Sequence, residues 1–400
     1  MRNEWILDKN HLSYWLRQLR KERELVGPLL NGGKDIVFRT VEQIHEIVLD
    51  LPASLPSPKE FLLPQYEPML RLDIPSGEPG VHYRAQPVSP DACVKGSRAG
   101  RVYDLAERRR RIVFGVRPCD VSAVRLLDRF FLEGYRDPYY EQRRMNTLMV
   151  TIACNNPDPT CFCIGLGTGP YLDGGFDIQL TDLGNRYFVQ AASAEGVRTV
   201  KATSFLFRRP GKADHDDQYE VILSAKARFR KRISLESPRG MILAGRIKDD
   251  FWQRVAARCF ECGGCVYECP LCTCFTVTDR RYHGGIERAR LWDTCLFKGF
   301  TRMAGGVLPN EKRMLRTKRW YYHKLIHYPE VLGGFGCVGC GRCTLTCPGK
   351  IDMAAIATAM KGLDLDGATA VVGKGRQVGI GEVMRRPKPE ETGAGPEGEG

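Results

Sequence analysis

The chain has 400 residues, of which 43% are hydrophobic and 27% charged, and its formal net charge is +13. This composition supports two or three globular domains and excludes disorder as the main state, whereas the basic balance alone would suit nucleic acid, an acidic protein partner or an anionic cofactor. No apolar run approaches the roughly 20 residues that cross a bilayer, and the first residues lack the apolar core of a signal peptide, so we expect a cytoplasmic protein with no membrane span. Sixteen cysteines are unusual in that compartment, because a reducing cytosol disfavours disulfides. They indicate ligation of a metal or of an iron–sulfur cluster.

Residues 1–245 alternate predicted helices and strands, which favours an α/β domain. Apolar spacing from Leu12 to Leu19 predicts an amphipathic helix, after which DIVFR predicts a strand and VEQIHEIVLDL a helix. The apolar runs RIVFGV and TLMVTIA predict buried strands, with a helix over 121–131 between them and Asp120 as its N-cap. Further along, FDIQL and RYFVQ flank the turn-forming TDLGN and predict a hairpin.

Residues 246–372 have a different character, with cysteine-rich loops between short stretches predicted to be helical. Among these stretches are GIERARLWDTCLFKGF and an Ala/Met-rich segment after Asp352. We therefore predict a mostly helical, ferredoxin-like domain here and an α+β fold for the chain as a whole. Residues 373–400 offer almost no apolar side chains to bury and are predicted to form a disordered tail.

Two cysteine runs in the second domain share one spacing. Each has the pattern C-x2-C-x2-C-x3-C-P of bacterial ferredoxins, in which three cysteines ligate one [4Fe-4S] cluster and the fourth ligates the other cluster. On that rule one cluster would take Cys259, Cys262, Cys265 and Cys347, and the other would take Cys337, Cys340, Cys343 and Cys269. Zinc is the simpler alternative, but it usually takes two separated pairs of ligands and fits a duplicated run of four poorly.

The 67 residues between Cys269 and Cys337 form a long insertion relative to a small ferredoxin. We expect helices in the insertion to bring Cys337 and the rest of the second run back to the first run. Crossed ligation requires the two runs to lie next to each other. Between Asp279 and Lys324 the insertion holds twelve Lys or Arg against four Asp or Glu, a net charge of +8. These cations could balance thiolate-bound clusters or form an ordinary solvated face, while nucleic-acid binding has the charge but no recognised module.

Four cysteines remain outside both runs and outside the first-domain group described next. Cys272, Cys274 and Cys295 could supplement or replace run ligands, or pack as small hydrophobic residues. Cys93 lies in a polar segment and is predicted to be an ordinary thiol.

A third candidate site lies in the first domain. Cys119 follows RIVFGV and Cys154 follows TLMVTIA, so both stand at the carboxyl ends of predicted strands, where α/β sheets present ligands. Cys161 and Cys163 share one side of an extended segment, because side chains repeat every second residue. The four cysteines should converge on one edge, where they could hold a third iron–sulfur cluster or a structural zinc, or be unrelated buried thiols.

Motifs for nucleotide binding and for the common hydrolytic mechanisms are missing from the sequence. The glycine-rich GLGTG at 165–169 lacks the GxGxxG order and no predicted strand leads straight into it. No GxxxxGK[ST] pattern occurs, and nothing resembles a Ser-His-Asp or HExxH constellation. The cysteines are therefore predicted to bind cofactors and not to catalyse.

A chain of motifs in order resembles the beta (iron-sulfur) subunit of cytoplasmic sulfhydrogenase-type NiFe hydrogenases, a family similar to the corresponding iron–sulfur subunit of anaerobic sulfite reductase. The motifs are KEFLLPQYEPMLR, GVRPCDVSAVRLLDRFF, DPYYEQRRMNTLMV, CFC, FDIQLTDLGNRYFV, CFECGGCVYECPLCTC, RLWDTC and CVGCGRCTLTCPGKIDM. The resemblance implies an electron-transfer subunit of a soluble complex that joins a flavin- and NAD(P)-binding subunit to a catalytic subunit, which would be a hydrogenase or a sulfite or sulfur reductase. RRPGKADHDD and the Gly/Glu-rich tail match no motif of this family.

Two other functional classes remain open at this point. A self-sufficient iron–sulfur reductase would hold its substrate near Cys272, Cys274 and Cys295, and a basic cluster protein could bind nucleic acid. Substrate turnover by the isolated chain would distinguish the first, and salt-sensitive DNA or RNA binding the second.

Overall fold

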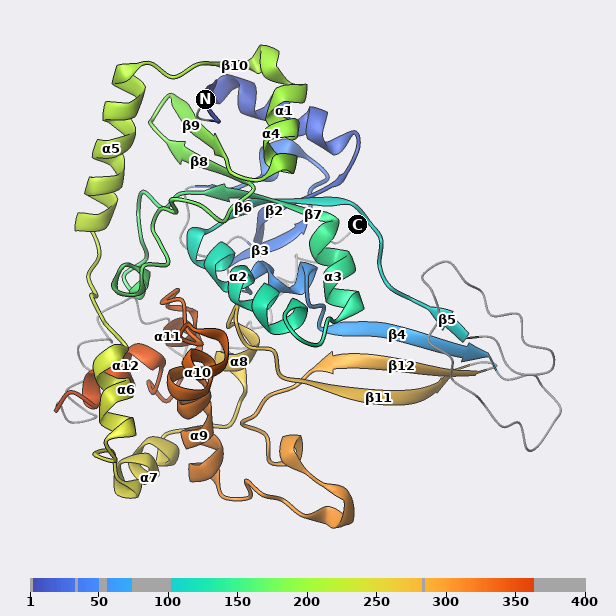
Figure 1. The fold of residues 1–400 in the computed structure, drawn as a ribbon, viewed down its shortest axis with the longest axis vertical. Helices are drawn as coiled ribbons and strands as arrows, with labels where there is room; N and C mark the ends of the chain where they lie inside the picture. The colour runs from blue at the N-terminus through green and yellow to red at the C-terminus, as the bar shows by residue number, and fades with distance from the viewer. Residues whose placement is uncertain (1–2, 33–34, 50–55, 74–101, 283–284, 363–400) are drawn as a thin grey trace, which may run out of the picture.

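The computed structural model describes residues 3–32, 35–49, 56–73, 102–282 and 285–362 (Figure 1). Cys93 and the tail predicted at 373–400 lie outside these residues. Within them no helix is long and apolar enough to cross a membrane.

The first part of the chain is built on an eight-stranded mixed sheet in the order β10-β1-β9-β8-β7-β6-β2-β3. Its central strands β2, β6, β7 and β8 run parallel, and the pairs toward both edges are antiparallel. The strands are β1 (Glu4–Asp8), β2 (Glu24–Asn31), β3 (Asp35–Thr40), β6 (Arg111–Val116), β7 (Thr147–Ile152), β8 (Ile178–Asp182), β9 (Arg186–Ala191) and β10 (Phe207–Arg208). The strands predicted from DIVFR, RIVFGV and TLMVTIA and the hairpin around TDLGN are thus confirmed.

Helices cover both faces of this sheet, which explains why every residue of β6 and β7 is buried. Val113 and Met149 share one core with α2 (Pro118–Leu132) and α3 (Pro138–Met145), while Ile112 and Leu148 share the other with α1 (Lys9–Arg20) and α4 (Ala194–Ala202). Neighbouring residues of one strand therefore serve opposite layers (Figure 1).

A second, four-stranded antiparallel sheet joins distant parts of the sequence in the order β11-β12-β4-β5. Its strands are β4 (Tyr66–Asp73), β5 (Val102–Asp104), β11 (Phe275–Tyr282) and β12 (Gly285–Trp292). β12 is GIERARLW, so the helix predicted there is wrong. This segment pairs with β11 on one side and with β4 on the other. Its side chains Glu287 and Arg290 are buried and form ion pairs with Arg280 and Glu67, which lie on these two neighbouring strands.

Beyond the large sheet the remaining helices are α5 (Lys212–Ala227) and α6 (Glu236–Leu243), which precede residue 246, and then α7 (Asp249–Ala257), α8 (Gly264–Tyr267), α9 (Arg313–Tyr322), α10 (Tyr328–Leu332), α11 (Arg342–Thr346) and α12 (Met353–Ala359). A π-helical turn at His323–His327 joins α9 to α10, and single 3-10 turns occur at Ile44–Glu46, Pro58–Phe61, Cys163–Leu166, Ser204–Leu206, Lys298–Thr301 and Ala304–Gly306. The Ala/Met-rich helix is confirmed as α12, with Asp352 as its N-cap. The α+β fold class is confirmed, whereas the domain boundary at residue 245 stays a prediction.

Two further local predictions are wrong for identifiable reasons. In the described part of VEQIHEIVLDL, residues 41–49, the one helical element is a 3-10 turn, because Val41 and Val48 donate backbone hydrogen bonds to β2 at Leu25 and Pro28. The helix α2 begins at Pro118 with Arg117 as its N-cap, and Asp120 is inside its first turn. The Asp120 carboxylate is not a cap because it pairs with Arg342.

Candidate iron–sulfur centres

The cysteines of the two runs face each other across two adjacent cavities. Cys259, Cys262 and Cys265 line one cavity together with Cys347 of the other run, and this cavity encloses about 450 Å³. Cys337, Cys340 and Cys343 line the second together with Cys269, in about 350 Å³. This is the crossed arrangement expected from the ferredoxin spacing. Both cavities also share Cys265 and Trp320, so the two candidate centres are neighbours.

The insertion between the runs returns the chain to this place, but not by helices alone. It leaves the first run through the hairpin β11–β12 and comes back through α9, the π-helical turn and α10 (Figure 1). Trp320 of α9 and Lys324 of the π-helical turn then line the cavity of the second run. The expectation of a wholly helical insertion is therefore wrong.

A third cavity, in the first domain, is lined by all four cysteines predicted to converge there. Cys119 lies in the first turn of α2, directly after β6, and Cys154 follows β7. Because β6 and β7 are parallel neighbours, the two thiols come to the same edge of the sheet. Cys161 and Cys163 complete the lining of a cavity of about 390 Å³.

The loop that carries Cys161 and Cys163 packs directly on the second cysteine run. The Phe162 amide donates to the Gly339 carbonyl at 2.8 Å, and Cys161 Sγ lies 3.4 Å from the Cys340 carbonyl oxygen. No side chain would fit at this contact: a Cβ on Gly339 would lie 2.6 Å from the Cys163 backbone nitrogen, and one on Gly341 would lie 2.3 Å from Thr160 Oγ1. Both glycines also have positive φ, which other residues rarely adopt.

A buried ion pair links the same two regions. The Arg342 guanidinium donates to both carboxylate oxygens of Asp120, at 2.6 and 2.9 Å, and the two side chains are 0% and 2% exposed. Asp120 follows Cys119, while Arg342 lies between Cys340 and Cys343. The sequence shows both residues, but no local pattern signals that they pair across 222 positions.

Two buried lysines lie against the end of the first run, at Cys269 and Cys272, and sequence reasoning missed both. Lys324 Nζ donates to Cys269 Sγ at 3.3 Å and to the Gly336 carbonyl at 2.7 Å, and Lys59 Nζ donates to the Cys272 carbonyl at 3.0 Å. Neither has a carboxylate within ion-pair distance in the described part of the chain. Burial lowers the pKa of both ammonium groups, but for Lys324 the neighbouring Cys269 and Cys272 outweigh burial and raise the pKa above its usual value.

These cavities fit thiolate-bound iron–sulfur clusters. Burial raises the pKa of run thiols such as Cys265 and Cys343, so without a metal they would hold their protons, whereas metal ligation requires thiolates. A thiolate-bound cluster would supply the negative charge that Lys59 and Lys324 otherwise lack. Among the described residues no three His, Cys, Asp or Glu side chains are grouped closely enough for a single metal ion.

The three extra thiols line none of the three cavities described above. Cys272 is hydrogen-bonded to Cys269, and Cys274 and Cys295 are hydrogen-bonded to each other at the base of the β11–β12 hairpin. That hydrogen bond from Cys295 lowers the pKa of Cys274 to about 7. These three thiols therefore lie beside the end of the first run and at the base of the hairpin that follows it.

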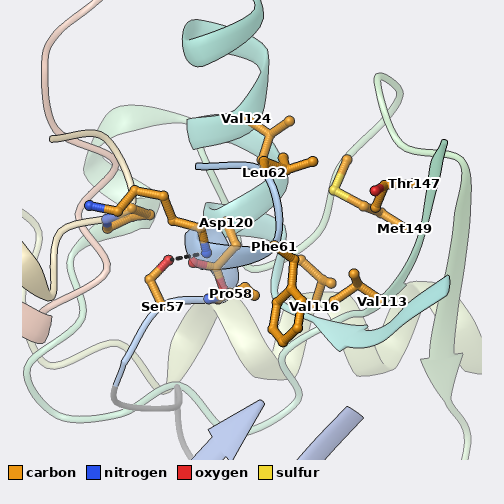
Figure 2. Close-up of a pocket in the computed structure, with 12 residues that line it drawn as sticks. Ser57, Pro58, Phe61, Leu62, Val113, Val116, Asp120, Val124, Thr147 and Met149 are labelled. Atoms are coloured by element: carbon orange, nitrogen blue, oxygen red, sulfur yellow. Dashed lines mark hydrogen bonds between the residues drawn. The ribbon is translucent and has the colours of Figure 1, made fainter. Parts of the chain in front are cut away.

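A fourth cavity, without cysteines, lies between the Pro58–Phe61 turn and the strands β6 and β7. Figure 2 shows its mostly apolar wall, which includes Phe61, Leu62 and Val113, with Asp120 at one side. Ser57 Oγ accepts a hydrogen bond from the Lys59 amide there, and Pro270 of the first run also contributes to the lining. This cavity is an apolar space between the two regions and offers no cluster ligand.

Comparison with known proteins agrees with this geometry. The sequence pattern of a family described as a 4Fe-4S dicluster domain matches residues 258–351, which include all eight run cysteines. The chain is also similar to sulfhydrogenase 2 subunit beta of Pyrococcus furiosus, with 29% identity over 349 residues, a match that covers 86% of this chain and 95% of that protein. The match extends well beyond the dicluster region and supports a role as an iron–sulfur electron-transfer subunit of a larger complex.

Proposed function

From the similarity to a sulfhydrogenase beta subunit and the match to a 4Fe-4S dicluster domain, we propose that the chain belongs to the sulfhydrogenase beta subunit family and relays single electrons through three [4Fe-4S] centres between two partner subunits. A bound cluster supplies one-electron chemistry at each cavity. The proposed ligands are Cys259, Cys262, Cys265 and Cys347 for the first-run centre, Cys337, Cys340, Cys343 and Cys269 for the second-run centre, and Cys119, Cys154, Cys161 and Cys163 for the N-terminal centre.

The observation that carries this proposal is the linear order of the three cavities. The N-terminal loop contacts the second run through Cys161 and Phe162, and the second-run cavity shares Cys265 and Trp320 with the first-run cavity. Electron tunnelling falls steeply with distance, so the second-run centre would connect the other two. The chain's residues hold the centres, exclude water and set the local charge.

The proposed partners are a flavin- and NAD(P)-binding subunit on one side of the relay and a catalytic subunit on the other. The catalytic subunit would be a hydrogenase or a sulfite or sulfur reductase. We place this complex in the cytoplasm, where free thiols persist, in keeping with the fifteen free cysteines of the described residues.

The first test is a count of iron. Anaerobically purified protein should hold about 12 iron atoms if all three centres form, and about 8 if only the two runs are used. Replacing Cys161 and Cys163 together by Ala should remove about four iron atoms and leave the EPR signals of the other two clusters. Cys93→Ala serves as the control and should leave the iron content intact. An unchanged iron content in the double variant would reject the N-terminal centre.

The second test separates a relay from a self-sufficient reductase. Alone, the chain should be inert toward hydrogen, sulfite and nicotinamides, because it has no hydride-transfer motif. With its flavoprotein partner, NADH or NADPH should bleach the clusters in a stopped-flow experiment. Rapid bleaching by nicotinamide without any partner would instead favour the self-sufficient reductase.

A further inference from the structure

The first-run centre is the most exposed of the three. Cys262 is the one exposed cysteine among those described, and the neighbouring Phe260 side chain is 70% exposed. In contrast, Cys119, Cys161 and Cys163 of the N-terminal centre are buried. A protein that exchanges electrons with this chain could therefore approach most closely at Cys262.

Basic residues lie on the chain segments that adjoin the first-run cavity. Arg313 donates to the Cys259 carbonyl at 3.1 Å, with the exposed Lys312 next to it in sequence, and the exposed Lys350 follows Cys347 closely and donates its amide to the Cys347 carbonyl. The two acidic residues on the same segments are already ion-paired: Glu261 with Arg316, and Glu311 with Lys298. The rim formed by Lys312, Arg313 and Lys350 is thus positive.

An aromatic centre with a charged rim is the usual composition of a specific protein interface. We propose that Phe260 and Cys262, with the rim of Lys312, Arg313 and Lys350, form the docking surface for an electron-transfer protein with an acidic surface. This inference rests on the proposed relay. It adds that the first-run centre is the end of the relay at which an acidic electron-transfer protein docks. Charge complementarity would steer the partner so that its redox centre meets the first-run centre.

The test uses the full chain, loaded with iron, and reduced flavodoxin as an acidic electron-transfer probe. The double variant Lys312→Glu and Lys350→Glu should accept electrons from flavodoxin roughly tenfold more slowly at low salt, because steering is lost. The wild-type rate should fall as salt rises, while the variant rate should change little or in the opposite direction. Phe260→Ala should also slow the transfer, through lost contact.

Lys201→Glu is the matched control, since it reverses the same exposed charge on α4, a helix that packs on the large sheet. It should transfer electrons at the wild-type rate. Unchanged flavodoxin rates in the double variant would overturn the docking surface. Duplex DNA binding that the same double variant abolishes would overturn it too, by assigning the basic rim to nucleic acid.

Reduction by dithionite, which is a small molecule, tests the relay separately. All variants should keep the wild-type iron content and be reduced fully by dithionite. If the wild-type clusters themselves accepted no electrons from dithionite, the proposed relay would fail, whatever the surface does.

Discussion

Lys324→Met should lower the midpoint potential of the second-run centre by about 100 mV. The Lys324 ammonium donates to Cys269 Sγ and has no carboxylate within ion-pair distance in the described residues, so its charge acts mainly on the thiolate-bound site. A cation stabilises the more negative, reduced form. At an effective dielectric constant of about 20 and an average separation of about 7 Å between the ammonium and the added electron, the interaction would be about 2 kcal/mol, which corresponds to about 100 mV.

The measurement is an EPR-monitored redox titration of the iron-loaded chain. Lys318→Met is the control, because Lys318 lies on the preceding helix α9 and pairs with Asp249 away from the cysteines. It should leave all potentials within about 20 mV, since exposed charges are screened. Lys324→Arg should recover most of the shift. Equal potentials for wild type and Lys324→Met would show that this lysine supports the fold alone.

The convergence of the run cysteines could be predicted from sequence because their signal is local and chemical. A spacing of two residues between cysteines leaves few uses other than metal ligation, and the structure brings the two runs together across the insertion in the crossed arrangement that the spacing implies. The convergence of the four first-domain cysteines could be predicted by a different argument. Cys119 and Cys154 follow apolar strands, and parallel strands present their carboxyl ends at one edge of a sheet.

The segments that were predicted wrongly take their structure from distant partners. GIERARLW has a helix-compatible composition but pairs with β4, more than 200 positions earlier in the chain. Val41 and Val48 of VEQIHEIVLDL donate backbone hydrogen bonds to carbonyl groups of β2. Such pairings override local propensity and leave no mark in the segment itself.

The charged residues that support the clusters were also beyond sequence reasoning. Lys59 and Lys324 are two of sixty Lys and Arg in the chain, and only the fold reveals which are buried against thiols. The sequence showed an excess of positive charge in the insertion. A net charge summed over the whole insertion could not identify Lys324 as the lysine that contacts Cys269.

Asp120→Ala should destabilise the protein by about 3–5 kcal/mol, the usual cost of removing one partner of a buried ion pair. Arg342 would remain fully buried, with the nearby Cys340 thiolate as its main source of negative charge. Because Asp120 adjoins Cys119 and Arg342 lies within the second run, the contact between the N-terminal and second-run centres should loosen as well. We therefore expect a lower urea midpoint and faster loss of the iron bound in the first domain.

Two comparisons isolate the buried pair. Arg288→Ala removes the exposed pair with Asp279 and should cost no more than about 1 kcal/mol. The double variant Asp120→Leu and Arg342→Met replaces both charges by apolar groups and should be more stable than Asp120→Ala, since no charge is left buried alone. Urea unfolding of the anaerobic, iron-loaded proteins measures all three. If Asp120→Ala proved as mild as Arg288→Ala, water or another group would have to compensate Arg342, and the pair would not be what holds the two centres together.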